Sequence, residues 1–457
     1  MVPEPSRLLP AESPSAEPSG AYLARASALN LAARVISGAA TLGLAALTTN
    51  VLDTQGRGVY VLLTTWVAIG STVITGGMMV LAADLIHRRQ SEATLHGAAT
   101  AIGAASLALL APLGLAASVV WTSVTVPDLL VAALLTALLT YIGFEVAIVQ
   151  AQGRVVAVSL IGIGLEGLPL VATAVAALII DPTATSLLMA WAAAELATAL
   201  ALFVRSIRHG STLPWRARRV AASIIRRSFG VALWKGATLL CSRIDVLIVA
   251  AVLSTSAAGI YSIPVALSSA LLLLSRALMT ATYHPIMTAP ERQLGARLGM
   301  ALRHSVIVVL AAGGLAVPVV ALGSGFIFGE AYADIWKPFA VLVAAAACLA
   351  VAELTGQVLL TRLERQRELL VIWSVSLVVN GVLAAVGAKW FGLVGAAAST
   401  TITYVGAAIA QLWFCSRLIS APMRQLAVPS RADLGAYVRA VRSLAARLRL
   451  TVIRPQW

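Results

Sequence analysis

Residues 229–283 read FGVALWKGATLLCSRIDVLIVAAVLSTSAAGIYSIPVALSSALLLLSRALMTATY, two apolar spans joined by a short polar link. Each span reaches the roughly 20 residues that an α-helix needs to cross a bilayer, so the stretch predicts a membrane hairpin. Four charged residues lie inside it, namely Lys235, Arg243, Asp245 and Arg276. Because a charge at the centre of a membrane helix costs roughly 2.5–3.5 kcal/mol, we expect these side chains to face a cavity or one another.

Part of this hairpin occurs twice. The block NVLDTQGRGVY at 50–60 aligns without a gap with AVLSTSAAGIY at 251–261, and Arg34 falls on Lys235 in the same register. Because transporter folds are commonly built from internal repeats, the alignment predicts two equivalent six-helix lobes. The identical pairs are Val51 and Val252, Leu52 and Leu253, Thr54 and Thr255, Gly58 and Gly259, and Tyr60 and Tyr261.

Composition places the chain in a membrane. Of its 457 residues, 60% are hydrophobic and 11% are charged, and the mean hydropathy is +0.91. Soluble domains carry about 25% charged residues. The net charge of +14 does not indicate nucleic acid, because the basic residues lie in short segments between or after apolar spans and form no nucleic-acid-binding module.

Twelve apolar stretches are long enough to span a bilayer. The predicted fold class is therefore an all-α integral membrane protein, with about twelve transmembrane helices in two pseudo-symmetric six-helix lobes. The stretches lie near 24–49, 58–84, 96–120, 128–150, 156–180, 184–206, 230–253, 258–282, 304–326, 336–361, 369–388 and 392–416.

Basic residues lie almost entirely at one end of these spans. If both termini are at that end, 26 Lys and Arg lie in its segments, and only Arg57, Lys337 and Lys389 lie in the opposite ones. Since Lys and Arg are retained on the cytoplasmic side, we predict a multi-pass protein with both termini in the cytoplasm. The abundance of Arg and Ala is typical of a GC-rich bacterium, which indicates a bacterial plasma membrane.

The charged segments also divide the chain. Residues 1–21, with five prolines, predict a disordered cytoplasmic leader. Residues 22–208 form the predicted first lobe, 209–228 a basic cytoplasmic loop between the lobes, and 229–417 the second lobe. Residues 418–457 predict a basic amphipathic helix that lies on the inner leaflet.

The sequence lacks the short motifs of the common enzyme classes. It contains no G-x-x-x-x-G-K-[ST], G-x-S-x-G or H-E-x-x-H motif. Its cysteines, Cys241, Cys348 and Cys415, lie in apolar spans without metal-ligand spacing. We therefore expect neither an enzyme nor a bound cofactor, and transport energy must come from an ion gradient, the substrate's own gradient or a partner.

The basic residues inside the spans predict an anion-binding cavity. The matching places of Arg34 and Lys235 direct both towards the centre of a pseudo-twofold bundle. In a continuous helix Arg243 lies about 12 Å beyond Lys235, and Arg276 returns along the next helix. Because Arg is the preferred bidentate partner of phosphate, we expect a phosphate-bearing substrate. Lys235 is also close enough to the helix end to extend its ammonium group to the membrane surface instead.

The acidic residues inside the spans leave two interpretations open. A carboxyl group near mid-membrane can take a proton or a cation and so couple transport to an ion gradient. Alternatively, carboxylates can form structural ion pairs between helices, as we expect in particular for Glu195 and Glu353. The five residues are Glu145, Glu166, Glu195, Asp245 and Glu353.

Taken together, these features resemble the polysaccharide-transporter branch, the O-antigen-type flippases, of the multidrug/oligosaccharidyl-lipid/polysaccharide (MOP) exporter superfamily. The similar motifs are R-x-D at 243–245, V-L-S-x-x-x-A-G-I-Y-S-x-P at 252–264 and F-G-L-V-G-A-A at 391–397. The blocks L-T-T-N-V-L and G-x-G-V-Y within 47–60 are similar too. Each motif is weak alone, but their order and their places on the helices match.

The resemblance implies a two-lobed bundle that alternates between inward-open and outward-open states. It also implies that the protein flips an undecaprenyl-diphosphate-linked oligosaccharide to the outer leaflet for surface polysaccharide synthesis, with basic cavity residues binding the diphosphate or glycan. The implied partners are this lipid-linked substrate, membrane lipids, and a polysaccharide polymerase or glycosyltransferases. The lipid II flippases of the superfamily have more helices than the twelve predicted here, which argues against that role.

The nearest alternative is a drug/cation antiporter on the same fold, which an acidic cavity would favour. A major-facilitator carrier fits less well, because residues 83–89 are a poor copy of its G-x-x-x-D-R-type loop. A membrane glycosyltransferase or polymerase would need a larger outer loop or domain. A non-transporting scaffold would leave the charges within the spans without a purpose.

Overall fold

The computed structural model describes residues 20–77, 91–117, 124–152, 154–208, 210 and 214–427. Within these ranges the chain folds into helices, and nine of them are long and apolar enough to cross a membrane. The protein is therefore a multi-pass membrane protein. Each of the twelve predicted stretches lies mostly on helix where it is described, and the number of membrane crossings stays a prediction.

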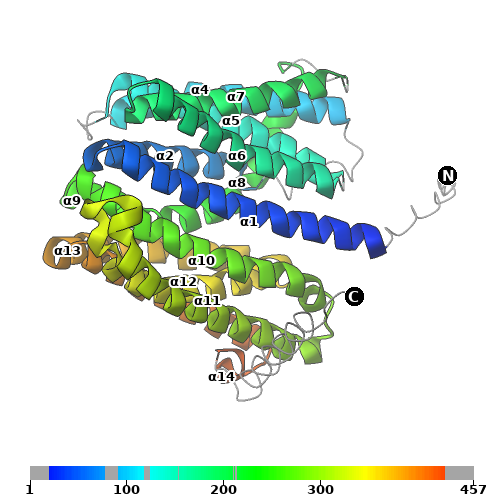
Figure 1. Ribbon diagram of the computed structural model, residues 1–457. Helices are drawn as coiled ribbons and strands as arrows, with labels where there is room; N and C mark the ends of the chain where they lie inside the picture. The colour runs from blue at the N-terminus through cyan, green and yellow to red at the C-terminus, as the bar shows by residue number, and fades with distance from the viewer. Residues whose placement is uncertain are drawn as a thin grey trace, which may run out of the picture.

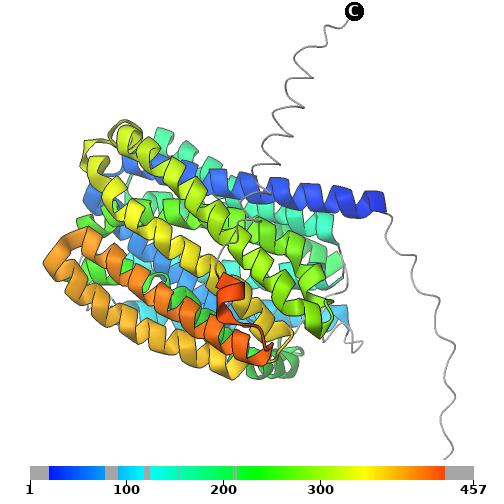
Figure 2. The ribbon, with the colours of Figure 1, turned by 90° about the horizontal axis from the view of Figure 1, so that it is seen from below.

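The helices form two lobes that pack by the same plan (Figures 1 and 2). In the first lobe α2 packs against α5 and α1 against α6; in the second α10 packs against α12, and α8 and α9 against α13. The first lobe comprises α1 (Gly20–Val51), α2 (Thr54–Thr75), α4 (Glu92–Ala117), α5 (Val126–Ala151), α6 (Val155–Ile179) and α7 (Ala184–Arg208). The second comprises α8 (Arg218–Cys241), α9 (Ile244–Val252), α10 (Thr255–Met287), α11 (Glu291–Phe328), the 3₁₀ helix η1 (Glu330–Ile335), α12 (Trp336–Thr361), α13 (Gln366–Leu418) and α14 (Met423–Ala427).

The repeated block forms the same helix corner in both lobes. The Asp53 carboxylate accepts a hydrogen bond from the Gly56 backbone N–H at 2.8 Å, at the start of α2. Ser254, at the aligned position, accepts one from the Ala257 backbone N–H at 3.0 Å, at the start of α10. Both residues therefore satisfy a backbone donor that the helix leaves free in its first turn.

The two lobes meet where these corners cross. A Cβ on Gly58 would collide with the Thr255 backbone, and a Cβ on Gly259 would lie 2.5 Å from the Thr54 carbonyl oxygen. Gly58 is aligned with Gly259 and Thr54 with Thr255, so each lobe makes the same contact with the other. This reciprocity is what a twofold axis between α2 and α10 requires. We call this end of the bundle the tight end.

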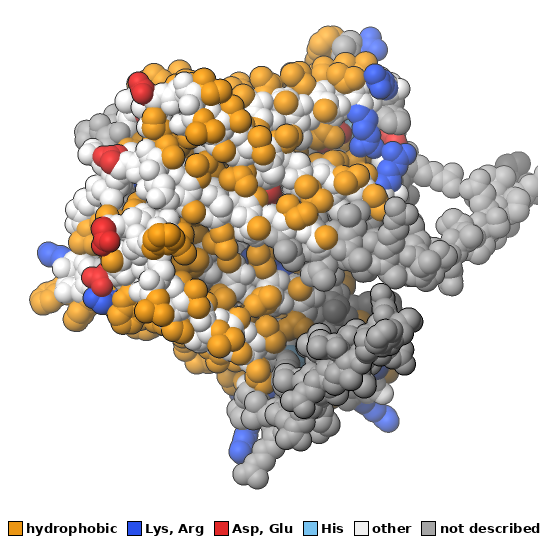
Figure 3. Space-filling model, in the orientation of Figure 1, with side chains coloured by type: hydrophobic (Ala, Val, Ile, Leu, Met, Phe, Trp, Pro, Cys, Tyr) orange, Lys and Arg blue, Asp and Glu red, His pale blue; other side chains and the backbone are white. Residues whose placement is uncertain are grey.

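Charge is distributed unevenly between the two ends. Figure 3 shows most Lys and Arg of the visible face at one edge and most Asp and Glu at the other, with hydrophobic side chains between them. The basic edge is the end where α1 starts and α7 finishes, opposite the tight end (Figure 1). We call it the basic end, and the predicted orientation places it in the cytoplasm.

The predicted loop at 209–228 is wrong in its second half, because α8 begins at Arg218. Ala217, Ala221 and Ile224 are buried among first-lobe side chains. Their spacing of four and three residues is helical, so one face of the basic segment is apolar. The first turns of α8 therefore pack on the first lobe, and the rest of the helix belongs to the second.

The predicted continuous span at 230–253 is also wrong. The helix breaks at Ser242 and Arg243, between α8 and α9. The Asn380 side chain of α13 donates a hydrogen bond to the Cys241 carbonyl oxygen at 2.9 Å. A helix can break inside a membrane where neighbouring groups satisfy the freed backbone, and Asn380 has this role here.

The last two predicted spans, 369–388 and 392–416, are the two arms of α13. The arms meet at Gly392, whose φ of +60° a residue with a side chain rarely adopts. They pack so closely that a Cβ on Gly387 would lie 2.5 Å from the Gly395 carbonyl oxygen. The predicted tail at 418–457 is described only as far as Ala427, where it contains the short helix α14, and the rest of the tail and almost all of the leader lie outside the described residues.

The crossing of α2 and α10 gives a testable prediction. In Gly58→Leu the added side chain has no room while the lobes touch, so we expect the lobes to separate at the tight end. Spin labels at Asp181→Cys and Lys389→Cys, one on each lobe, should then report a longer mean distance. Gly406→Leu is the matched control, because nothing lies within 4 Å of the Cβ it adds. An unchanged distance in Gly58→Leu would show that the crossing does not hold the lobes together.

Candidate functional site

Two cavities lie beside the lobe contact. The second-lobe cavity, of about 510 Å³, is lined mainly by α8, α10, α12 and α13. The inter-lobe cavity, of about 490 Å³, is lined by α1, α2, α6 and α7 on one side and by α10 on the other. Arg243, Ser269 and Arg276 line both, so these three residues form the wall that the cavities share.

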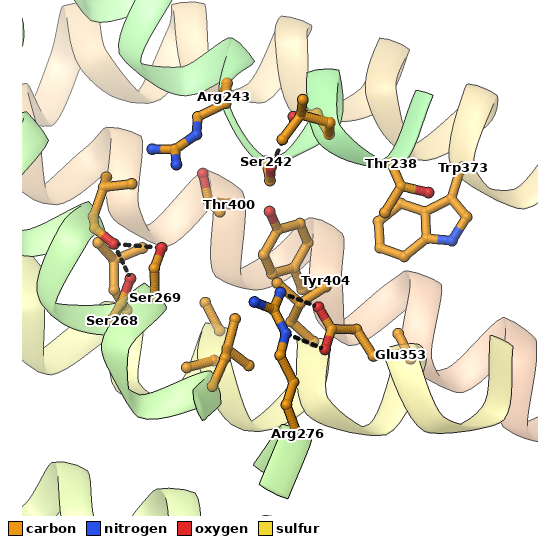
Figure 4. Close-up of a pocket in the computed structure, with 18 of the residues that line it drawn as sticks. Thr238, Ser242, Arg243, Ser268, Ser269, Arg276, Glu353, Trp373, Thr400 and Tyr404 are labelled. Atoms are coloured by element: carbon orange, nitrogen blue, oxygen red, sulfur yellow. Dashed lines mark hydrogen bonds and ion pairs between the residues drawn. The ribbon is translucent and has the colours of Figure 1, made fainter. Parts of the chain in front are cut away.

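Arg243 occupies the break between α8 and α9. The break places it before the first residue of α9, and its side chain lines both cavities. Figure 4 shows the guanidinium apart from the other labelled side chains. Among the described residues it has neither a carboxylate nor a hydrogen-bond partner. Its donors are therefore available to a ligand.

Arg276 shares this wall but is already paired. Its guanidinium contacts both carboxylate oxygens of Glu353, with Nε to Oε2 at 3.0 Å and Nη2 to Oε1 at 2.6 Å (Figure 4). The side chains are 41% and 22% exposed, because both border the cavity. This is the ion pairing between helices that we expected for Glu353, and it neutralises most of the Arg276 charge.

Lys235 lines the second-lobe cavity. It packs against α2 of the other lobe, where a Cβ on Gly76 would lie 3.1 Å from the Lys235 Cβ. No described carboxylate pairs with its ammonium group. The structure thus places Lys235 on the cavity wall, while its part in binding stays a prediction. Arg34, its counterpart, lies in α1, but its side chain is outside the described residues.

Asp245 is held by neutral donors. Its side chain is buried, and Oδ2 accepts hydrogen bonds from the hydroxyls of Tyr261 and Thr400, each at 2.9 Å. Oδ1 accepts one from the Val246 backbone N–H at 2.9 Å. Asp245 lies two residues from Arg243 but does not pair with it. Its carboxylate therefore belongs to a hydrogen-bond network between α9, α10 and α13.

The three glutamates of the first lobe lie in different surroundings. Glu145 is buried against His96, with Nδ1 to Oε2 at 2.9 Å, away from the residues that line the two cavities. Glu195 is also buried and accepts a hydrogen bond from Trp191 Nε1 at 3.1 Å, and because no described cation forms a salt bridge with it, the ion pair predicted for Glu195 is wrong within the described residues. Glu166 is open to the inter-lobe cavity, which Trp191 also lines.

Arg57 corrects the sequence analysis, which placed it in an outer segment. It is 3% exposed, in the first turn of α2, and it lines the inter-lobe cavity. It was missed because it stands close to the end of an apolar stretch. The repeat offered a signal, because Arg57 aligns with Ala258 and only one of the two lobes therefore has a charge at this corner.

The described cavity walls carry charges of both signs, but their partners differ. Glu353 is paired with an arginine, and Asp245 is held by three neutral donors. Glu166 lines the inter-lobe cavity as well and forms no salt bridge among the described residues. The cations Arg57, Lys235 and Arg243 also form no salt bridge with a described carboxylate, although Asp245 is close enough to attract Arg243 electrostatically. The charge still available to a ligand is therefore mainly positive, which suits an anionic group.

No protein-family model matches the sequence. Comparison with curated proteins likewise gives no match. Solved structures do match: an inward-facing multidrug resistance MATE family transporter of the MOP superfamily has a TM-score of 0.65 at 13% identity, covering 86% of this chain and 98% of its own. The chain has the MATE transporter fold.

Two further solved structures with this fold differ in state or polarity. An outward-facing MATE transporter has a TM-score of 0.59 at 13% identity, over 87% of this chain and 95% of its own. A MOP superfamily transporter from Pyrococcus furiosus has a TM-score of 0.60 at the same identity and coverage. Its binding pocket is described as having reverse polarity that suggests a different function. The MATE fold also accounts for the two pseudo-symmetric lobes.

The Asp245 network predicts a stability effect. In Asp245→Ala the Tyr261 and Thr400 hydroxyls lose their acceptor, and each buried donor left unpaired costs about 1–3 kcal/mol. We expect a clearly lower melting temperature in detergent micelles. Asp181→Ala is the control, because Asp181 is exposed. Equal melting temperatures for the two variants would contradict the structural role of Asp245.

Proposed function

We propose that this protein is a flippase that moves an undecaprenyl-diphosphate-linked oligosaccharide from the cytoplasmic to the outer leaflet of a bacterial plasma membrane. The observation that carries the proposal is Arg243, a guanidinium on the wall shared by both cavities with no acidic partner among the described residues. A ligand that reaches this wall meets an unpaired planar donor group. A diphosphate is the group whose geometry and charge such a donor fits best.

The rest of the second-lobe cavity suits the other parts of this substrate. Lys235 supplies a second cation on the wall, and Arg276 is held in place by Glu353. Hydroxyl and aromatic side chains also lie along this wall, where the hydroxyl oxygens that donate to backbone carbonyls keep their acceptor sites for a sugar. These side chains are Thr238, Ser242, Ser268, Ser269, Trp373, Thr400 and Tyr404.

The lobe contact suggests the transport step. In this structure the backbones of the two lobes meet at the tight end, and the predicted orientation places the basic end in the cytoplasm, so the proposed substrate enters from the basic end. Rocking of the lobes would break the contact between α2 and α10 and open the tight end. The two MATE transporters matched above are in inward-facing and outward-facing conformations, which supports such alternation in this fold.

The reverse polarity described for the Pyrococcus furiosus transporter bears on the substrate. It supports the view that this fold can present a pocket of different charge to a different class of substrate. The unpaired Arg243 and Lys235 favour an anion for the chain described here. We propose that a proton or cation binds Asp245 or Glu166 and that its gradient across the membrane supplies the energy for the cycle.

A drug/cation antiporter is the second candidate. Glu166 is open to the inter-lobe cavity, and Trp191 lines the same cavity. A carboxylate with an aromatic ring nearby is a suitable site for an organic cation. In this case the ligand would lie against the first lobe, and Arg243 would not contribute to its affinity.

Binding measurements on the full-length protein in nanodiscs separate the two candidates. We expect undecaprenyl diphosphate to bind the wild type and Arg243→Gln to bind it about tenfold more weakly or worse, because a hydrogen bond to a charged group contributes about 1.5–3 kcal/mol. Arg208→Gln is the matched control, since Arg208 is exposed at the end of α7.

The same preparations are then titrated with ethidium, a cationic dye. If the wild type binds ethidium but not undecaprenyl diphosphate, and Glu166→Gln removes ethidium binding, the protein is an antiporter. Equal affinity of Arg243→Gln and wild type for undecaprenyl diphosphate would also contradict the proposal, because the diphosphate would then bind elsewhere.

A further inference from the structure

Arg57 is a buried cation whose described partners are all uncharged. Its guanidinium donates to the Thr48 hydroxyl, to the Ala45 carbonyl oxygen at 3.2 Å and to the Ser262 hydroxyl at 3.3 Å. Its Nε has no hydrogen-bond partner among the described residues. A charge buried without a countercharge is strongly disfavoured, so its presence needs an explanation.

Tyr60, one turn further along α2, also has a buried donor without a hydrogen-bond partner. It is 5% exposed, and its hydroxyl has no described hydrogen-bond partner. Both Tyr60 and Arg57 line the inter-lobe cavity near the tight end. Two unsatisfied donors from one helix therefore border a cavity at the place where the lobes close.

Comparison with the repeat in the second lobe shows which partner is missing at the first-lobe corner. Tyr60 aligns with Tyr261, whose hydroxyl donates to Asp245 in the second lobe. The position aligned with Asp245 is Leu44 in the first lobe, so Tyr60 has no carboxylate to bind. The first lobe thus keeps the tyrosine and adds Arg57 but has no carboxylate at the position aligned with Asp245, and the nearest acid on the same cavity wall is Glu166 of α6.

We propose that Arg57 and Tyr60 form a second anion site, which takes the phosphate group of a ligand when the lobes separate at the tight end. This inference rests on the proposed function. It adds, to the entry site at Arg243, a second binding site from which the ligand leaves at the tight end. The ligand chemistry is a diphosphate, either free in solution or on a lipid headgroup.

The hydrogen bonds make this site depend on conformation. Thr48 and Ala45 belong to the first lobe and move with Arg57, whereas Ser262 belongs to the second. When the lobes part, Arg57 loses the Ser262 hydroxyl and gains a free donor towards the opening. The anion therefore binds the separated state more tightly, and by linkage it shifts the population towards that state.

The test uses the full-length protein in nanodiscs with spin labels at Asp181→Cys and Lys389→Cys. Two probes are titrated separately, namely inorganic pyrophosphate and undecaprenyl diphosphate. In the wild type at least one probe should increase the population with the longer distance between labels. A response to both assigns the site to the diphosphate group itself, and a response to the lipid alone assigns it to a headgroup delivered from the bilayer.

Arg57→Gln should need about tenfold more of the effective probe, or lose the response, because it removes a charged donor. Arg57→Lys keeps the charge and should respond in part, which guards against a folding defect in the glutamine variant. Tyr60→Phe should weaken the response less than Arg57→Gln does. Arg243→Gln should weaken probe binding in the closed state but keep the shift in distance.

Two results would overturn the inference, and they are distinguishable. If Arg57→Gln and wild type respond with the same midpoint, Arg57 is not an anion site, while the proposed function stands. If the wild type binds neither probe, the proposed function fails and the inference fails with it.

Discussion

The structure depends on how closely α2 and α10 approach each other at Gly58 and Gly259. The contact brings the backbone of each helix against the aligned residue of the other, so a side chain at either glycine would push the lobes apart. The lobes also pack together further along α2, where a Cβ on Gly236 of α8 would lie 2.8 Å from Val73 Cγ2. Both cavities lie beside the contact between the two glycines, and the Arg57–Ser262 hydrogen bond crosses it. A movement that opens the tight end must therefore break that contact and this hydrogen bond together.

The two lobes share a backbone plan but not a charge pattern. The helix corners, their N-caps and their glycines correspond, whereas Asp245 aligns with Leu44 and Arg57 with Ala258. The second lobe satisfies its carboxylate internally with neutral donors, and the first lobe leaves a cation without a countercharge. The fold thus explains the symmetry of the scaffold, and these few substitutions are the basis on which we propose an anionic ligand for the space between the lobes.

The fold could be predicted further from sequence than the site. Apolar length and the repeat were enough for two helical lobes, because both are local or periodic properties. The helix break at Arg243 was not predictable, since no proline or glycine marks it and Asn380, far along the chain, stabilises it. The partners of the charges depend in the same way on helices distant in sequence. Lys235, Arg243 and Arg276 do border cavities, but only the structure shows that Arg276 is neutralised by Glu353 and that Arg57 is buried.

The most direct test of an anionic, lipid-linked substrate is made in the cell. Lipids extracted from cells that lack this protein are analysed by mass for undecaprenyl-diphosphate glycans. The account predicts that a complete repeat unit accumulates and that a surface polysaccharide is lost. An unchanged pool of these lipids, together with a new sensitivity to cationic drugs, would contradict it and would leave the unpaired arginines in need of a structural explanation.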